Sequence, residues 1–195
     1  MQLQPNLHWT PNQNIVLPTV HANVELYPEF FTVHFSVQEP PSCFFAQMNK
    51  DGGHAWEESC VEVFVESLDN SGDYCNFEFT SKGFCYAARG QDRSHREEIT
   101  AEEYATIQRK VSLPHRDKSL ISWDLKVLIP AKLIGVEKDL TKKTLRGNLY
   151  KCADKSETPH YLSLFPINTK KPDFHRPEFF QKLIFSTGTI LYSPL

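Results

Sequence analysis

The chain has 195 residues, of which 40% are hydrophobic and 23% are charged, and its formal net charge is −3 at pH 7. This length suits one domain, and the composition excludes a disordered chain. Acidic and basic residues are interspersed without a basic stripe, which excludes nucleic acid as a partner. No apolar run is long enough to cross a membrane. We therefore expect one domain over residues 1–195, with no nucleic-acid partner and no membrane partner.

The cysteine pattern and the N-terminal residues indicate in which cellular compartment the protein is expected. The cysteine count is odd, and no CxxC pair exists, so we expect free, buried thiols and no zinc site. Residues 1–18 lack the charged and apolar segments of a signal peptide. We therefore expect a cytoplasmic protein, or a periplasmic or secreted one if a leader precedes residue 1. The five cysteines are Cys43, Cys60, Cys75, Cys85 and Cys152.

The first half of the chain is a series of short apolar segments separated by turn residues. Residues 1–10 are expected to form an arm. Alternation of apolar and polar residues, or a short apolar run, predicts each strand, and Asp, Gly, Asn and Pro clusters predict the turns. The predicted strands are residues 15–17, 31–37, 43–48, 60–66, 74–80 and 84–88.

The second half continues the pattern with one polar interruption. Residues 89–103 carry mixed charges and are expected to form a solvated surface loop with a helical turn at 101–104. Pro130 favours a short helix at 130–134, because proline is preferred at the first helical position. Further strands are predicted at 105–113, 120–129, 149–150, 161–165 and 183–185. Because helical periodicity is nearly absent, the fold class is all-β: a two-sheet antiparallel β-sandwich, jelly-roll or immunoglobulin-like, with one or two short helices.

One loop stands out as a candidate binding element. Pro172 and Pro177 bracket it, and two prolines exclude a helix interior or a central strand. The loop therefore displays Phe174, His175 and Arg176 on a constrained backbone, and binding residues are often carried on such loops.

Catalytic signatures are absent from the sequence. No GxSxG, HExxH or P-loop motif occurs. His160, Asp173, His175 and Glu178 are the residue types of a metal or acid–base cluster, but their spacing matches no strong signature. We favour a hydrogen-bonded structural role for them, and keep a hydrolase that uses this cluster as an alternative.

Sugar binding needs flat aromatic faces for pyranose rings and a few side chains that bind hydroxyl groups. Trp56 follows a glycine-rich turn, and Glu62 lies six residues further on. On these residues alone, Trp56 is more simply explained as a core or rim aromatic than as a sugar platform.

Motifs spread from Trp56 to Phe180 carry a family resemblance. The block HAWEESCVEVFVES resembles the Trp-x-x-Asp-x-Val-Glu-x-Phe motif of carbohydrate-binding module family 9. More narrowly, the whole chain resembles the single-domain family 9-like proteins common in gut Bacteroidetes. The other segments that carry the likeness are YCNFEF, RGNLYKC, PHYLSLFPI and PDFHRPEFF.

The resemblance implies a non-catalytic β-sandwich that holds a saccharide between two aromatic side chains. One matches Trp56, and the other, a tryptophan in well-studied members, falls on Phe174. Glu62 matches an acid that binds sugar hydroxyls, whereas Glu78 stands where some members have a sugar-binding arginine. Taken with the loop, the expected ligand-binding residues are Trp56, Glu62, Glu78, Phe174, His175 and Arg176.

No cofactor is expected, although some family members hold structural calcium, for which the turn acids Asp69 and Asp73 are the candidates. Three alternatives stay open: the hydrolase above, a structural or interaction β-sandwich, and a haem-binding domain with Met48 and a histidine as ligands. Neither the identity of the sugar nor the oligomeric state follows from the sequence.

Overall fold

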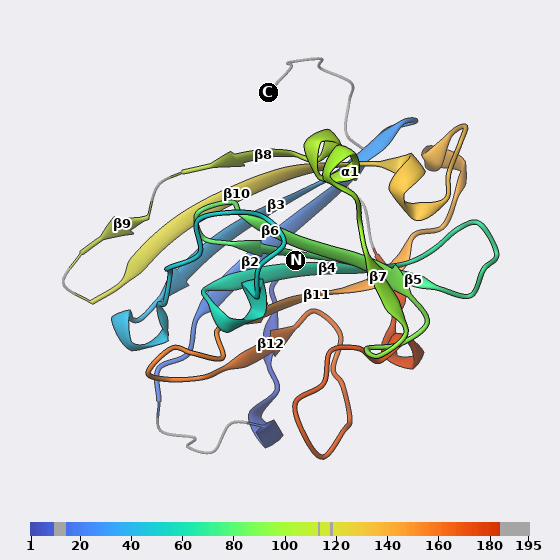
Figure 1. The fold of residues 1–195 in the computed structure, drawn as a ribbon. Helices are drawn as coiled ribbons and strands as arrows, with labels where there is room; N and C mark the ends of the chain where they lie inside the picture. Colours follow the sequence, from blue (N-terminus) through green and yellow to red (C-terminus); the bar gives the residue numbers. More distant parts are fainter. Residues whose placement is uncertain (10–14, 113, 118, 184–195) are drawn as a thin grey trace.

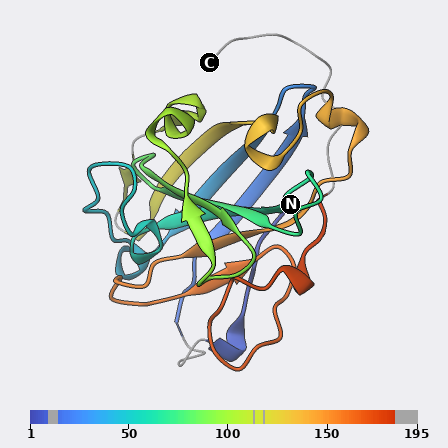
Figure 2. The same ribbon diagram turned by 45° about the vertical axis from the view of Figure 1, so that its right-hand side comes forward.

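The computed structural model describes residues 1–9, 15–112, 114–117 and 119–183, which form two antiparallel sheets packed face to face (Figure 1 and Figure 2). The predicted all-β sandwich is therefore confirmed. Among the described residues the α-helix is α1 (Ala101–Thr106), and it begins with a capping box in which Thr100 and Glu103 bind each other's backbone N–H groups. Within the described ranges, no helix has the length and apolar character needed to cross a membrane.

The larger sheet has the strand order β1-β12-β11-β4-β5-β6-β7, and β13 pairs with β11 beyond the end of β12. Its strands are β1 (Gln4–Pro5), β4 (Cys60–Glu66), β5 (Tyr74–Thr80), β6 (Cys85–Gly90), β7 (Arg96–Glu98), β11 (Arg146–Cys152), β12 (Tyr161–Ser163) and β13 (Gln181–Lys182).

The smaller sheet has the order β2-β3-β10-β8, with β9 paired to β10. Its strands are β2 (Thr19–Leu26), β3 (Phe30–Glu39), β8 (Gln108–Val111), β9 (His115–Arg116) and β10 (Ile121–Pro130). Short 3-10 helices join the strands: η1 (Leu7–Trp9), η2 (Pro41–Cys43), η3 (Ala55–Glu57), η4 (Ala131–Ile134), η5 (Leu140–Lys142) and η6 (Pro177–Phe179).

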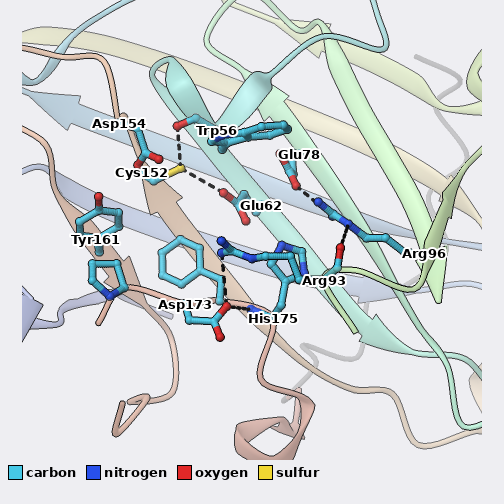
Figure 3. Close-up of a pocket in the computed structure, with 12 residues that line it drawn as sticks. Trp56, Glu62, Glu78, Arg93, Arg96, Cys152, Asp154, Tyr161, Asp173 and His175 are labelled. Atoms are coloured by element: carbon cyan, nitrogen blue, oxygen red, sulfur yellow. Dashed lines mark hydrogen bonds and ion pairs between the residues drawn. The ribbon is translucent and has the colours of Figure 1, made fainter. Parts of the chain in front are cut away.

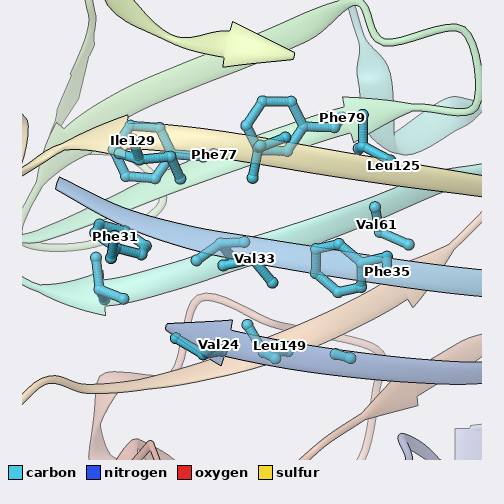
Figure 4. Close-up of a cluster of buried hydrophobic side chains, with 14 of the residues drawn as sticks. Val24, Phe31, Val33, Phe35, Val61, Phe77, Phe79, Leu125, Ile129 and Leu149 are labelled. Atoms are coloured by element: carbon cyan, nitrogen blue, oxygen red, sulfur yellow. The ribbon is translucent and has the colours of Figure 1, made fainter. Parts of the chain in front are cut away.

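The main hydrophobic core lies between the two sheets (Figure 4). Along β10, buried and half-buried residues alternate without a break, so that one face of the strand enters the core. On β4 the inward residues are Val61, Val63 and Val65, all fully buried. Burial of each such side chain contributes about 1.5–3 kcal/mol to folding. Because these valines fix one face of β4 in the core, the residues that alternate with them point outward, away from the smaller sheet.

The outward face of the larger sheet is covered as well. Cys60, Glu62 and Phe64 alternate with the core valines, yet all three are buried. A second aromatic cluster covers them, drawn from the N-terminal segment, η3 and the segment 167–180. Its buried members are Trp9, Ala55, Cys60, Phe64, Tyr74, Tyr150, Cys152, Ile167, Phe174 and Phe180. The central strands of this sheet are therefore buried on both faces.

Residues 43–48 do not form the predicted strand. Cys43 ends η2, and residues 44–48 are irregular chain whose backbone N–H groups donate to side chains of the segment 58–59. The Ser59 hydroxyl accepts a hydrogen bond from Phe45 N–H at 3.1 Å, and the Glu58 carboxylate accepts from Gln47 and Met48. These side-chain acceptors replace a β-ladder, which explains the wrong prediction.

The N-terminal predictions also need correction. Residues 1–10 are no free arm, because β1 pairs with β12, and both Leu3 and Trp9 are buried. Residues 15–17 are not a strand, and Val16 is 71% exposed. The strand in this part of the chain is β2, which the sequence analysis overlooked. The N-terminal segment is thus part of the larger sheet and of its outer cover.

The remaining strand predictions are confirmed within a few residues, as are the helical turn in α1 and the short helix at η4, which is a 3-10 helix. The predicted strand at 183–185 lies mostly outside the described residues. The segment 89–103 is not a single solvated loop, since β6 extends to Gly90 and β7 follows at Arg96. All five cysteines are free and buried, as predicted.

Candidate functional site

A pocket of about 240 Å³ opens on the outward face of the larger sheet (Figure 3). Its floor consists of side chains from the central strands β4, β5 and β11. Its walls come from η3, the β6–β7 connection, the segment after β11 and the loop before η6. The lining residues are Trp56, Glu62, Glu78, Arg93, Arg96, Cys152, Asp154, Tyr161, Pro172, Asp173, Phe174 and His175.

A row of four cross-strand neighbours forms the centre of the floor. Tyr150 of β11, Glu62 of β4, Glu78 of β5 and Tyr86 of β6 lie directly opposite one another in successive antiparallel pairs. Residues opposite each other in an antiparallel ladder share a face, so all four side chains point outward. The row therefore places two carboxyl groups side by side between two tyrosines.

Both carboxyl groups are buried, each at 2% exposure. The Cys152 thiol donates to Glu62 Oε1 at 3.0 Å, and the Asn76 amide donates to Glu78 Oε1 at 3.0 Å. Burial raises the pKa of Glu62 to about 7, and burial together with the charge of Glu62 raises the pKa of Glu78 well above its ordinary value. The floor is therefore acceptor-rich and holds a proton near neutral pH.

Two polar atoms at this floor have no hydrogen-bond partner in the protein. They are Glu78 Oε2 and Arg96 Nη1, and both are buried. Arg96 Nη1 lies 3.8 Å from the other oxygen of Glu78, which is too long for a hydrogen bond. Buried polar atoms are normally satisfied, so an unpartnered acceptor and donor in one pocket indicate the place of a polar ligand or water.

Arg93 and Arg96 were assigned by the sequence analysis to a solvated surface. The structure corrects this expectation, because both line the pocket, and the Arg96 side chain is only 13% exposed. Arg96 also lies over the Tyr86 ring at 5.4 Å, and Arg93 is 3.3 Å from Asp173. The guanidinium groups of the site thus come from β7 and the turn before it.

Trp56 and Phe174 contact opposite ends of the floor row. Phe174 stacks on Tyr150 with 4.1 Å between ring centroids and a 5° interplanar angle. Trp56 meets the Tyr86 ring edge-on at 5.7 Å, and it stacks on His54 at 4.5 Å. Trp56 is half-buried, whereas Phe174 is 8% exposed.

The remaining residues of the predicted loop divide into two groups. His175 lines the pocket, and its Nδ1 lies 2.7 Å from the Tyr74 hydroxyl. Burial, together with nearby Arg96 and Arg93, lowers the pKa of His175 to about 3, so the imidazole is neutral. Arg176 is not among the lining residues, and its Nε donates to Glu178 at 2.8 Å. Five of the six predicted ligand-binding residues therefore line one pocket.

The histidine cluster considered for a hydrolase is not assembled. Asp173 and His175 line the pocket, but His160 and Glu178 do not. His160 is fully buried, with Nε2 at 2.9 Å from Lys151 Nζ and Nδ1 at 2.9 Å from the Thr158 carbonyl. Lys151 points inward, because it alternates with the outward residues of β11. His160 therefore belongs to the interior between the sheets.

Several pocket residues escaped the sequence analysis. Alternation along β11 and β12 places Cys152 and Tyr161 on the face of Tyr150, and the two are direct cross-strand neighbours. That signal was readable once the strands were assigned. Asp154 and Arg93 lie in turns, where no regular alternation of residues predicts the direction of a side chain.

Metal ligation has one geometric candidate among the described residues. Ligand atoms of Cys60, Glu62 and Cys152 all lie within 4.8 Å of one another. Burial raises the pKa of Cys60 to about 12 and that of Cys152 well above its ordinary value, so both thiols hold their protons. Asp69, considered for calcium, accepts hydrogen bonds from Ser67 and Ser71 of its own turn, and Asp73 N–H donates to Ser71. Met48, considered for haem, packs against the aromatic cluster.

Comparisons with known proteins identify the family of this chain. The profile of carbohydrate-binding family 9 matches residues 2–185. A solved structure from Bacteroides uniformis, a protein provisionally assigned as carbohydrate-binding, is similar with a TM-score of 0.77 and 32% sequence identity, over 87% of this chain and 79% of that one. No curated protein matches. The match over nearly the whole chain shows that this protein belongs to carbohydrate-binding family 9.

Proposed function

We propose that this protein binds a saccharide in the pocket, without catalysis, with one sugar ring stacked between Trp56 and Phe174. The observation that carries the proposal is the unpartnered pair Glu78 Oε2 and Arg96 Nη1 at the bottom of an aromatic-lined pocket. A sugar hydroxyl group both donates and accepts a hydrogen bond, so one hydroxyl satisfies both atoms.

The contacts of the two aromatic walls support stacking. Trp56 has one ring face against His54, and Phe174 has one face against Tyr150. Phe174 also contacts the rings of Trp9 and Tyr161, at 5.9 and 6.1 Å between centroids. Both Trp56 and Phe174 line the pocket, from opposite ends of the Tyr150–Tyr86 row. A pyranose ring presents apolar C–H faces, which match aromatic surfaces, while its edge presents hydroxyl groups to Glu62, Glu78 and Arg96.

The arrangement of the carboxyl groups favours binding over hydrolysis. Glycoside hydrolysis uses two acids that flank the scissile bond from opposite sides. Glu62 and Glu78 instead lie next to each other on one floor, as direct neighbours of β4 and β5. Both would face the same side of a bound ring, so we assign them to hydroxyl recognition.

Titration calorimetry with a panel of mono- and disaccharides tests the proposal. Binding should appear for at least one sugar, and Trp56→Ala should weaken it by about tenfold or more, since loss of a stacking surface removes on the order of 1 kcal/mol beyond area burial. Tyr27→Ala is the matched control, because Tyr27 stacks on Phe30 at 4.5 Å but does not line the pocket.

Chromatography of the same mixtures checks the assignment as a non-catalytic protein. Unchanged saccharides after long incubation are expected. Release of a shorter sugar would instead show that the protein hydrolyses its ligand and is an enzyme. If no sugar of the panel binds, or if a folded Trp56→Ala variant binds as tightly as the parent, the proposal is wrong.

A further inference from the structure

Acidic side chains outnumber basic ones in the lining of the pocket. The lining includes two guanidinium groups, from Arg93 and Arg96, and four carboxyl groups, from Glu62, Glu78, Asp154 and Asp173. Arg93 lies 3.3 Å from Asp173, and Arg96 lies 3.8 Å from Glu78. Each guanidinium therefore already has a carboxylate beside it, which leaves two of the four acids without an ion pair of their own.

The two remaining acids are Glu62 and Asp154. Figure 3 shows Asp154 next to Cys152 at one side of the pocket and Glu62 in the middle, between Cys152 and Glu78, while Arg96 lies at the other side. The hydrogen-bond donor to Glu62 is the uncharged Cys152 thiol at 3.0 Å. Desolvation raises the pKa of Asp154, with the Tyr161 hydroxyl partly opposing it, and the charge of Asp154 contributes to the raised pKa of Glu62.

Other groups around Cys152 add to this negative potential. The Trp56 carbonyl lies 3.4 Å from the Cys152 sulfur, so two acceptors compete for a single thiol proton. The Trp56 and Tyr161 rings also line the pocket, and aromatic faces attract cations. Glu78, buried at 2% exposure with an unpartnered oxygen, shows independently that the floor is incomplete without a donor from outside the protein.

We propose that the pocket selects a saccharide that carries a protonated amine, an amino sugar, with its ammonium group between the carboxylates of Glu62 and Asp154. This inference rests on the proposed function, since it concerns the same pocket. An ammonium group offers three donors and a full positive charge, and charge-assisted hydrogen bonds are the strong ones. The ring hydroxyls then go to Glu78 and Arg96. An acidic sugar fits less well, because both guanidiniums already lie beside carboxylates.

Calorimetry near neutral pH with matched sugars tests the inference. Glucosamine is compared with glucose and N-acetylglucosamine, and galactosamine with galactose and N-acetylgalactosamine, so that only the amine changes within each set. The amino sugar of one set should bind about tenfold tighter than both of its partners, as expected for a charge-assisted contact in a partly solvated site. Added salt should narrow this gap, because it screens the attraction.

The variant Asp154→Asn removes one negative charge with little change of shape. Asp154 lies at the rim, where part of the residue is exposed although its carboxyl group is partly desolvated, and its backbone N–H donates to the Trp56 carbonyl, a contact that the substitution leaves in place. Most of the amino-sugar preference should vanish, while the affinity for the neutral sugar stays within about twofold. Glu157→Gln is the matched control, since it removes the same charge from an exposed residue of the same segment outside the pocket lining.

The outcomes separate this inference from the proposed function. Equal or tighter binding of glucose, galactose or their N-acetylated forms overturns the amine preference and leaves saccharide binding in place. An amino-sugar preference that Asp154→Asn does not change overturns the assigned position of the ammonium group. Failure of every sugar to bind overturns both. A glucosamine or galactosamine preference that Asp154→Asn removes, and Glu157→Gln retains, supports the inference.

Discussion

The inward and outward faces of β11 each lie beside a group of buried charges, and the two groups differ in how far the protein satisfies them. On the inward face, Lys151 and Glu39 are both fully buried and lie 3.0 Å apart. Lys151 Nζ also contacts His160 Nε2 at 2.9 Å and the Cys152 carbonyl at 2.9 Å. The Trp123 indole donates to Glu39 at 2.7 Å.

On the outward face, Glu62 and Glu78 are also nearly inaccessible, yet they lie side by side, and Arg96 Nη1 is 3.8 Å from Glu78. Glu78 and Arg96 each keep an unpartnered buried atom. Glu39 Oε2 also has no hydrogen-bond partner, but its charge is compensated by Lys151 at 3.0 Å. Similar burial thus accompanies different degrees of charge compensation. Burial of a charge is costly unless partners compensate it, so a compensated pair points to a structural role, and an uncompensated group beside a cavity points to a ligand.

The largest expected effect concerns the inward network. Lys151→Met keeps the length of the side chain but leaves the Glu39 carboxylate without its cation. Removal of one partner of a buried pair typically costs about 3–5 kcal/mol, so the free energy of unfolding should fall by about that amount. Urea denaturation measures it.

The control for this prediction is Lys155→Met. Lys155 lies 2.8 Å from Glu57, but its side chain is 59% exposed. Exposed ion pairs contribute about 0–1 kcal/mol. If both variants lose the same stability, burial of the network does not matter and the comparison between the two faces fails.

Glu62→Gln, in contrast, should raise the free energy of unfolding. Because the folded protein raises the pKa of Glu62 from 4.5 to about 7, the stability contributed by its protonated form is present below pH 4.5 and is lost as pH rises through 7. Glutamine does not ionise. The unliganded variant should therefore match the parent at low pH and exceed it by about 3 kcal/mol above pH 7.

Thermal melting across this pH range measures the difference. Glu66→Gln is the control, since Glu66 lies on the same strand but pairs with Arg146 at 3.0 Å near the surface. A pH-independent difference for Glu62→Gln would show that Glu62 is ionised throughout and that its carboxylate is compensated.

The strands and the outward position of Glu62 were accessible from the sequence. Alternation around Val61, Val63 and Val65 defines the two faces of β4, and the outward face carries Glu62. β2 has the same period in Val20, Ala22 and Val24. Ala and Asn are depleted in strands, however, which obscured the pattern.

Other features of the fold and of the site depend on contacts between residues far apart in the sequence, so a local sequence pattern could not predict them. Residues 43–48 are apolar enough for a strand, but Glu58 and Ser59 capture their backbone groups. Arg96 looks like any surface charge in the sequence. The fold places it against Tyr86 and Glu78, and only the strand order β5-β6-β7 reveals that neighbourhood.

Arg96→Met sharpens the comparison by separating binding from stability. Methionine retains much of the packing on Tyr86 but offers no donor to a ligand. Saccharide affinity should fall by about 2 kcal/mol, the value of a hydrogen bond to a charged group, while stability changes by less than about 1 kcal/mol. Calorimetry and melting measure the two. Arg89→Met, which removes a pair with Glu103 away from the pocket, should leave the affinity unchanged.

The smallest expected effect concerns Asp173, at the rim of the unsaturated site. Its Oδ1 accepts a hydrogen bond from the His175 N–H at 3.1 Å and lies 3.3 Å from Arg93. Asp173→Asn keeps an acceptor for the backbone but removes the charge, whereas Asp173→Ala removes both. Because Arg93 is 60% exposed, the ion pair contributes little, and the backbone bond should account for most of about 1 kcal/mol. The melting temperature of Asp173→Asn should therefore be close to that of the parent, and that of Asp173→Ala should be lower. If Asp173→Asn and Asp173→Ala lose the same stability, the ion pair with Arg93, and not the backbone hydrogen bond, stabilises the His175 loop. Charge pairing would then contribute to the rim of the site as much as it does to the floor.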